Sequence, residues 1–94
     1  MIKFEWDEKK NQSNHKKHGI WFEEAQQVFD DIGAVMFFDE EHSGHEDRFI
    51  LLGISASVRV LVIVYCERQK GKVVRIISAR KATKKEIKQY EKRV

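Results

Sequence analysis

The first third of the chain shows two different hydrophobic periods. Apolar and charged side chains alternate over residues 2–6, which predicts a short strand with one buried face. Asp7 then has the side chain of a helix N-cap, residues 8–18 predict a polar helix, and Gly19 is suited to end it. Residues 22–30 carry apolar side chains at spacings of three and four, which predicts a second, amphipathic helix.

The middle of the chain is dominated by β-forming residues. Stretches rich in Val, Ile, Leu and Phe predict strands at residues 34–38, 48–55, 58–68 and 72–80. An acidic loop at residues 39–47 separates the first of these strands from the second. The second and third are close enough for a tight hairpin through Ala56-Ser57, and Gly71 offers a positive-φ position in the next turn.

A helix is predicted at the end of the chain. Thr83 and Glu86 form a capping box, in which each side chain satisfies a backbone amide of the first turn. We expect this helix to run to about Arg93, with Tyr90 and Val94 on its apolar side.

The resulting order of elements is β-α-α-β-β-β-β-α. Consecutive strands with short turns favour an α+β fold in which an antiparallel sheet has its helices packed on one face and its other face open. The 94 residues allow one compact core, so we expect a single domain over residues 1–94. A hydrophobic fraction of 41% argues against disorder.

Charge is distributed unevenly along the sequence. The net charge is +3, but residues 1–67 carry 7 basic and 13 acidic residues, whereas residues 68–94 carry 11 basic and 2 acidic residues. A basic C-terminal third is typical of proteins that bind a phosphate-bearing partner. A solvated basic helix, or a surface that meets an acidic protein, would give the same pattern.

The number of cysteines and the length of the apolar runs indicate the cellular compartment in which the protein is expected. Cys66 is the single cysteine and is best interpreted as a buried structural thiol, since it has no internal disulfide partner. The longest apolar run, Val60–Val64, is far too short to span a membrane, and no run resembles a signal peptide. We therefore expect a cytoplasmic protein without a membrane partner.

Two motifs carry a family resemblance. Residues 6–19 read W-D-x-x-K-x-x-x-N-x-x-K-H-G, and residues 75–90 read R-I-I-S-A-R-x-A-x-x-x-E-x-x-x-Y. Together with Phe-Glu-Glu-Ala at residues 22–25, they resemble the BrnT family of type II toxin–antitoxin systems, whose fold is related to RelE-type ribonucleases. Trp21 departs from the family, which often has a small capping residue there, and it is a candidate interface residue if exposed.

The resemblance implies a function and a set of partners. It implies a toxin that inhibits translation by cutting RNA and that is neutralised by a BrnA-like DNA-binding antitoxin. The expected complex is a heterotetramer with two copies of each protein, which represses its own promoter. Operator DNA would then be contacted only through the antitoxin, and RNA would be the substrate.

RNA cleavage without a metal uses the 2′-hydroxyl as the nucleophile, and it requires a base, an acid and charge relief at the phosphate. Arginine suits the phosphate because its guanidinium donates two parallel hydrogen bonds. Arg48, Arg75 and Arg80 are the candidates. Ideal alternation places Arg75 and Arg80 on opposite faces of one strand, although a bulge or twist could bring them together.

Each candidate arginine also has a structural alternative. Arg80 could anchor the last helix through Glu86, and Arg75 could form a cross-strand salt bridge. Arg48 follows the acidic loop and could pair locally with Glu46 or Asp47. Further RNA-binding candidates lie in the basic C-terminal third; these are Arg68, Lys81, Lys84 and Lys85.

The proton carriers are harder to identify. His18 and Lys17 end the first predicted helix and are the catalytic candidates, while Tyr65 and Glu67 are alternatives. Tyr65 is better interpreted as a core residue of the central strand.

The sequence gives only weak indications of a metal site or of a surface that binds a partner protein. Histidines at positions 15 and 18, and at 42 and 45, are spaced like zinc ligands but have no third ligand nearby, so no metal and no cofactor is expected. Phe37 and Phe38 are consecutive in a strand, so one of them faces away from the core and is a candidate partner surface.

Three classes of function therefore compete. The first is a ribonuclease, and the second is a basic RNA- or protein-binding module that cleaves nothing. A DNA-binding regulator is a third and weaker possibility, because the sequence has no helix-turn-helix signature.

Overall fold

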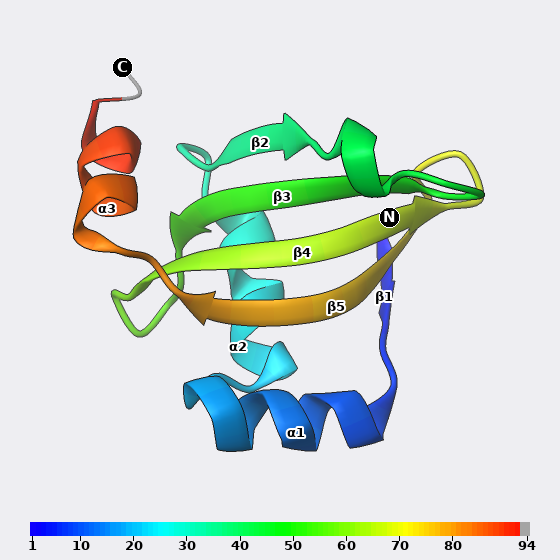
Figure 1. The fold of residues 1–94 in the computed structure, drawn as a ribbon, viewed down its shortest axis with the longest axis horizontal. Coiled ribbons are helices and arrows are strands. Elements are labelled where there is room, and N and C mark those ends of the chain that lie inside the picture. The colour runs from blue at the N-terminus through cyan, green and yellow to red at the C-terminus, as the bar shows by residue number, and fades with distance from the viewer. Residues whose placement is uncertain (93–94) are drawn as a thin grey trace.

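Five strands form one sheet in the order β1-β5-β4-β3-β2 (Figure 1). A computed structural model describes residues 1–92 of the chain. The strands are β1 (Lys3–Glu5), β2 (Val35–Phe38), β3 (Asp47–Ile54), β4 (Val60–Arg68) and β5 (Val73–Lys81). The helices are α1 (Glu8–His18), α2 (Phe22–Gln27) and α3 (Lys84–Glu91), with short 3-10 turns η1 (Val28–Asp30) and η2 (Glu40–His42). The predicted α+β class and the predicted order of elements are confirmed.

Local capping determines where the helices begin and end. The Asp7 carboxylate accepts the backbone N–H of Lys9 at 2.9 Å, and Gly19 ends α1 with φ of 74°. At α3 the predicted capping box is present, with Thr83 and Glu86 each accepting the other's backbone N–H. The predicted end of this helix at Arg93, and the position of Val94, lie outside the described residues. Within residues 1–92, no helix is both long and apolar enough to cross a membrane.

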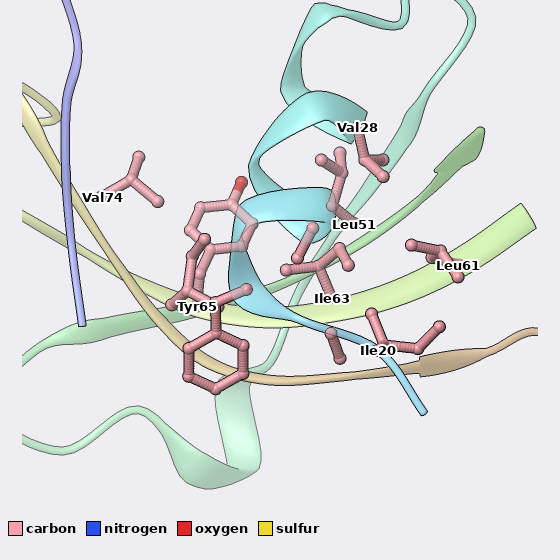
Figure 2. Packing of buried hydrophobic residues seen from close by; sticks show 11 residues of the cluster. Ile20, Val28, Leu51, Leu61, Ile63, Tyr65 and Val74 are labelled. Carbon is pink, nitrogen blue, oxygen red and sulfur yellow. The ribbon is translucent and has the colours of Figure 1, made fainter. Parts of the chain in front are cut away.

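The main core lies between the sheet and the pair α1 and α2. Figure 2 shows its central side chains, which come from residues 20–28, in and around α2 and the start of η1, and from β3, β4 and β5. The fully buried members include Ile20, Phe22, Leu61 and Ile63. Leu61 and Ile63 are alternate positions of β4, and both point toward the helices. The residues between them therefore point to the opposite face of the sheet.

That opposite face carries a second, smaller core under α3. Leu52 of β3 and Val62 of β4 are nearly fully buried there against Tyr90 of α3. The expectation that all helices pack on one face is therefore wrong for α3. The physical reason is that β3 and β4 are apolar on both faces near this end, which needs a cover on both sides.

One pair of strands departs from the expected antiparallel arrangement. β1 pairs with β5 in parallel, with Phe4 opposite Val74, whereas the other three pairs are antiparallel. Since no hairpin joins β1 to β5, turn geometry does not set their relative direction. The chain instead crosses over through α1 and α2 before it returns to the sheet.

Two asparagines, rather than apolar residues, are the buried side chains of α1. Asn14 donates to the carbonyl of Ala79 at 2.8 Å and accepts the Ala79 N–H at 3.1 Å, which are the bonds that a neighbouring strand would make. Asn11 accepts the N–H of Phe22 at 2.7 Å. The polar helix α1 thus covers the β5 edge beyond the point where β1 ends.

Candidate functional site

The sheet surface that faces away from α1 and α2 carries four arginines. They are Arg48 on β3, Arg68 on β4, and Arg75 and Arg80 on β5, and together they define the arginine face. The register places Arg48 opposite Cys66 and Cys66 opposite Arg75, so these three residues form one row across three strands. Because β3 and β5 are two strand spacings apart, the Cα atoms of Arg48 and Arg75 are separated by roughly 10 Å.

A β-bulge decides which face Arg75 and Arg80 share. Tyr65 pairs with Ile76 and Val64 pairs with Ser78, so Ile77 has no partner on β4. The extra residue shifts the alternation of side chains by one position. Arg75 and Arg80 therefore lie on the same face of β5, roughly 15 Å apart along the strand.

Carboxylates hold the two arginines nearest the β4–β5 loop. A single oxygen of Glu5 accepts from Arg75 and from Arg68, each at 3.0 Å. Arg68 also donates from Nε and Nη2 to Glu46, and the Arg68 hydrogen bond lowers the pKa of the Glu46 carboxyl. The cross-strand salt bridge considered for Arg75 is present. Both guanidinium groups stay partly exposed, at 31% for Arg75 and 40% for Arg68.

Arg48 pairs with a different acid from the two that the sequence suggested. Its Nε lies 3.7 Å from Oδ2 of Asp39, whereas Glu46 binds Arg68. The Arg48 Nε is buried and makes no hydrogen bond within the described residues. A buried donor without a partner is costly, so this guanidinium has unused hydrogen-bonding capacity on the arginine face.

Arg80 lies at the α3 end of the face and forms a bidentate pair with Glu86. Its Nη1 and Nη2 donate to the two Glu86 oxygens at 2.8 and 2.9 Å. The Arg80 hydrogen bonds lower the pKa of Glu86 to about 2, and they raise the pKa of Arg80. The structural alternative for Arg80, anchoring the last helix, is therefore present in the structure, while 42% of its side chain remains exposed.

His18 and Lys17 lie outside the arginine face. Both line a groove of about 230 Å³ between α1 and the β5 edge, together with Lys10 and the bulge residues Ile77 and Ser78. His18 is half-buried and Lys17 is exposed. The structure thus separates these two candidates from the row of Arg48 and Arg75, although the bulge borders both regions.

The remaining basic candidates are exposed and lie in different places. Lys84 and Lys85 are in the first turn of α3. Lys81 is near Glu24 of α2, whose pKa is lowered mainly by its hydrogen bond from Arg59 and to a smaller extent by Lys81. Lys81 therefore lies nearer the helix side of the sheet than the arginine face.

Tyr65 and Cys66 are buried, as their core interpretation predicts. Tyr65 packs against Phe49 in the main core, and burial raises its pKa to about 12. Burial also raises the pKa of the Cys66 thiol. Neither group is ionised near neutral pH, which makes both poor proton acceptors. Among residues 1–92, no three His, Cys, Asp or Glu side chains are grouped so that they could hold a metal ion.

Sequence reasoning missed the surroundings of Arg48. His42 was considered only as a zinc ligand, yet its Nδ1 lies 3.0 Å from Oδ2 of Asp39, the carboxylate that faces Arg48. An Asp-x-x-His spacing is a sequence signal for this contact, because a turn brings positions three apart together. The sequence alone did not show that the turn would place His42 beside the arginine face.

Several aromatic and apolar side chains are exposed. Trp21 is 43% exposed and stacks on His15 with ring centroids 3.8 Å apart, beside a pocket of about 530 Å³ that Glu8 and Glu23 also line. Trp21 is the N-cap residue of α2, but its side chain makes no capping hydrogen bond to the helix. Phe37 and Phe38 on β2 are 39% and 53% exposed, so both contribute to the surface of this edge strand.

The fold defines the chain as a small α+β protein with one five-stranded sheet, whose arginine face suits a phosphate-bearing partner. Residues 6–86 match the family described as "Ribonuclease toxin, BrnT, of type II toxin-antitoxin system". The chain therefore belongs to the BrnT family, and membership of a type II system implies an antitoxin partner.

A solved structure agrees with this assignment. The fold is similar to that of the Brucella abortus ribonuclease toxin BrnT, determined at 1.1 Å resolution, with a TM-score of 0.70 and 25% sequence identity. The similarity covers 89% of this chain and 100% of the Brucella chain. No match was found among curated protein sequences.

Proposed function

We propose that this chain is an endoribonuclease that cuts RNA on the arginine face, without a metal and by attack of the 2′-hydroxyl on the adjacent phosphate. One observation carries the proposal: the bulge at Ile77 places Arg75 and Arg80 on the same face as Arg48 and Arg68. Four guanidinium groups on one rigid sheet can bind successive phosphates of an RNA strand.

The ion pairs on this face do not prevent RNA binding. Exposed ion pairs contribute about 0–1 kcal/mol each, so phosphate can replace Glu5 as the partner of Arg75 and Arg68 at small cost. Arg48 and Arg75 would then lie on either side of the scissile phosphate, and Arg68 would hold a neighbouring one. Arg80, Lys84 and Lys85 would extend contact toward α3.

We propose that His18 and Lys17 contact RNA at the border of the arginine face. The groove that they line reaches Ser78, which pairs with Val64 on the arginine face. RNA that crosses the β5 edge at the bulge would bring its backbone to both side chains. Lys81, nearer the helix side, is proposed to contact RNA only beyond this edge.

The biological consequence that we propose is inhibition of translation in the cytoplasm, reversed by a BrnA-like antitoxin. The antitoxin would bring carboxylates to the arginine face, replacing the intramolecular partners Glu5 and Glu46, and would cover exposed apolar residues such as Phe37. A complex with two copies of each protein would contact operator DNA through the antitoxin alone.

Purified wild-type chain, free of antitoxin, should be incubated with a synthetic RNA in the presence of EDTA. We expect fragments that end in a 2′,3′-cyclic phosphate and a 5′-hydroxyl, and no cleavage where the scissile nucleotide lacks its 2′-hydroxyl. Arg75→Ala should reduce cleavage by about 100-fold. Arg59→Ala is the matched control, because Arg59 forms a similar ion pair with Glu24 next to α2.

Two outcomes would contradict parts of the proposal. Dependence on added divalent metal would overturn the metal-free mechanism. Tight RNA binding without cleavage by the wild-type chain would favour the alternative, a basic module that binds RNA and cuts nothing.

A further inference from the structure

The turn between β2 and β3 brings a histidine next to Arg48. Asp39 precedes η2 and its carboxylate accepts from Nδ1 of His42, at 3.1 Å to Oδ1 and 3.0 Å to Oδ2. The same carboxylate is 3.7 Å from Nε of Arg48. Asp39 thus contacts both a histidine and one arginine of the arginine face.

Three hydrogen bonds fix the position of this turn relative to β3. Asp39 N–H donates to the carbonyl of Arg48 at 2.8 Å, and Arg48 N–H donates to Oγ of Ser43 at 2.9 Å. The Ser43 hydroxyl in turn donates to the carbonyl of Asp39 at 2.7 Å. These bonds flank His42 on both sides, so its ring is held beside the arginine face rather than on a loose loop.

The Asp39 carboxylate also selects the tautomer of His42. A carboxylate accepts but does not donate, so Nδ1 carries the proton and Nε2 of the neutral ring has a free lone pair. The Asp39 side chain is 15% exposed and that of His42 is 57% exposed. The carboxylate is therefore shielded, while the imidazole is open to a substrate.

We propose that His42 is the general base of the cleavage reaction and that Asp39 is its positioning residue; the inference rests on the proposed ribonuclease function. Nε2 of His42 takes the proton of the 2′-hydroxyl as the 2′-oxygen forms its bond to phosphorus. The bond between phosphorus and the 5′-oxygen breaks with its electron pair, and that oxygen takes a proton from water. His42 then returns its proton to water.

The geometry favours His42 over the other histidines of the structure. His15 is stacked on Trp21, and His18 lies in the groove beside α1, so neither adjoins the row of Arg48 and Arg75. His45 is exposed in the same loop as His42 but makes no side-chain hydrogen bond to a carboxylate within residues 1–92. His45 therefore offers a control of identical chemistry and similar exposure.

The test compares His42→Ala, His45→Ala and wild-type chain on the same RNA, with kcat and KM measured separately. We expect His42→Ala to lower kcat by about 100-fold and leave KM unchanged, since a general base contributes about 10²–10⁴-fold. Added imidazole should restore cleavage by His42→Ala at least about tenfold, because it replaces the missing base. His45→Ala should cut like the wild type.

The outcomes separate this inference from the proposed function. If the wild type cuts and His42→Ala cuts equally well, His42 is not the base and the ribonuclease function stands. Loss of activity that imidazole does not restore, with a lowered melting temperature, shows a structural role and also overturns the inference. If the wild type cuts no RNA, the ribonuclease function fails and the inference fails with it.

Discussion

Arg75 and Arg80 project from the same face of β5, although five positions separate them along the chain. Arg75 is in register with Cys66 and Arg80 with Val62, and the unpaired Ile77 lies between these two pairs. Bulges are recurrent devices for redirecting side chains next to functional sites. The relationship makes β5 a strand that presents guanidinium groups at both ends of one surface.

The proposed binding of phosphate by Arg80 and its anchoring of α3 through Glu86 can be tested separately by changing each residue of the pair. Arg80→Ala removes both, whereas Glu86→Gln weakens the anchor and leaves the guanidinium in place. We expect each variant to lose about 1 kcal/mol of unfolding free energy, because the pair is partly exposed. Cleavage should fall about tenfold or more in Arg80→Ala alone. Equal cleavage by the two variants, measured with urea denaturation alongside, would leave Arg80 with the anchoring role only.

The Arg80–Glu86 pair also predicts a pH dependence of stability. The pKa of Glu86 is lowered to about 2 from 4.5 in the folded chain, so the unfolded chain binds a proton first as the pH falls. The stabilisation is therefore complete above pH 4.5 and is lost as the pH falls toward 2. After allowance for solvent screening, it amounts to about 1–2 kcal/mol. Urea denaturation between pH 6 and pH 2 should show a smaller decrease for Glu86→Gln than for wild type; parallel curves would contradict the assignment.

Signals that act over a few residues made the element order predictable. Asp7, Gly19 and Thr83 mark helix boundaries through contacts with backbone groups two to four positions away. The parallel pairing of β1 with β5 and the position of α3 depend instead on contacts between segments far apart in sequence. Tyr90, for example, has a helical apolar spacing that is compatible with either face of the sheet.

The sequence predicted which types of residue form the candidate site, but not how their side chains are arranged in space. Arginine chemistry pointed to positions 48, 75 and 80, but strict alternation separated the last two, since a bulge leaves no clear mark in a sequence of apolar strand residues. His42 carried a spacing that suggested a metal ligand. Its position beside Arg48 depends on how the turn between β2 and β3 lies against β3, which hydrophobic periodicity does not report.

Tyr65 should be dispensable for cleavage although it was a possible proton carrier. Its ring is in the main core against Phe49, and with a pKa of about 12 its hydroxyl stays protonated at neutral pH. We expect Tyr65→Phe to keep kcat within about twofold of wild type, because the substitution retains the packing of the ring. A loss of cleavage comparable to that of Arg75→Ala, with an unchanged melting temperature, would show that the hydroxyl takes part in the reaction.

Asn14 should be among the most destabilising positions to truncate, although it is polar and belongs to a helix without an apolar face. Its amide donates to the carbonyls of Ile20 and Ala79 at 2.9 and 2.8 Å, and its oxygen accepts the Ala79 N–H. Asn14→Ala would leave unpaired the Ile20 carbonyl, between α1 and α2, and both backbone groups of Ala79 on the β5 edge. We expect this to cost about 2–4 kcal/mol of unfolding free energy.

The matched control is Gln12→Ala on the exposed side of the same helix, where alanine is neutral or slightly stabilising. Urea denaturation of the two variants measures the difference directly, and equal stabilities would mean that the Asn14 bonds contribute nothing. Hydrogen exchange at the Ala79 amide adds a local measurement. Its protection should fall in Asn14→Ala and persist in Gln12→Ala, because only Asn14 covers that amide.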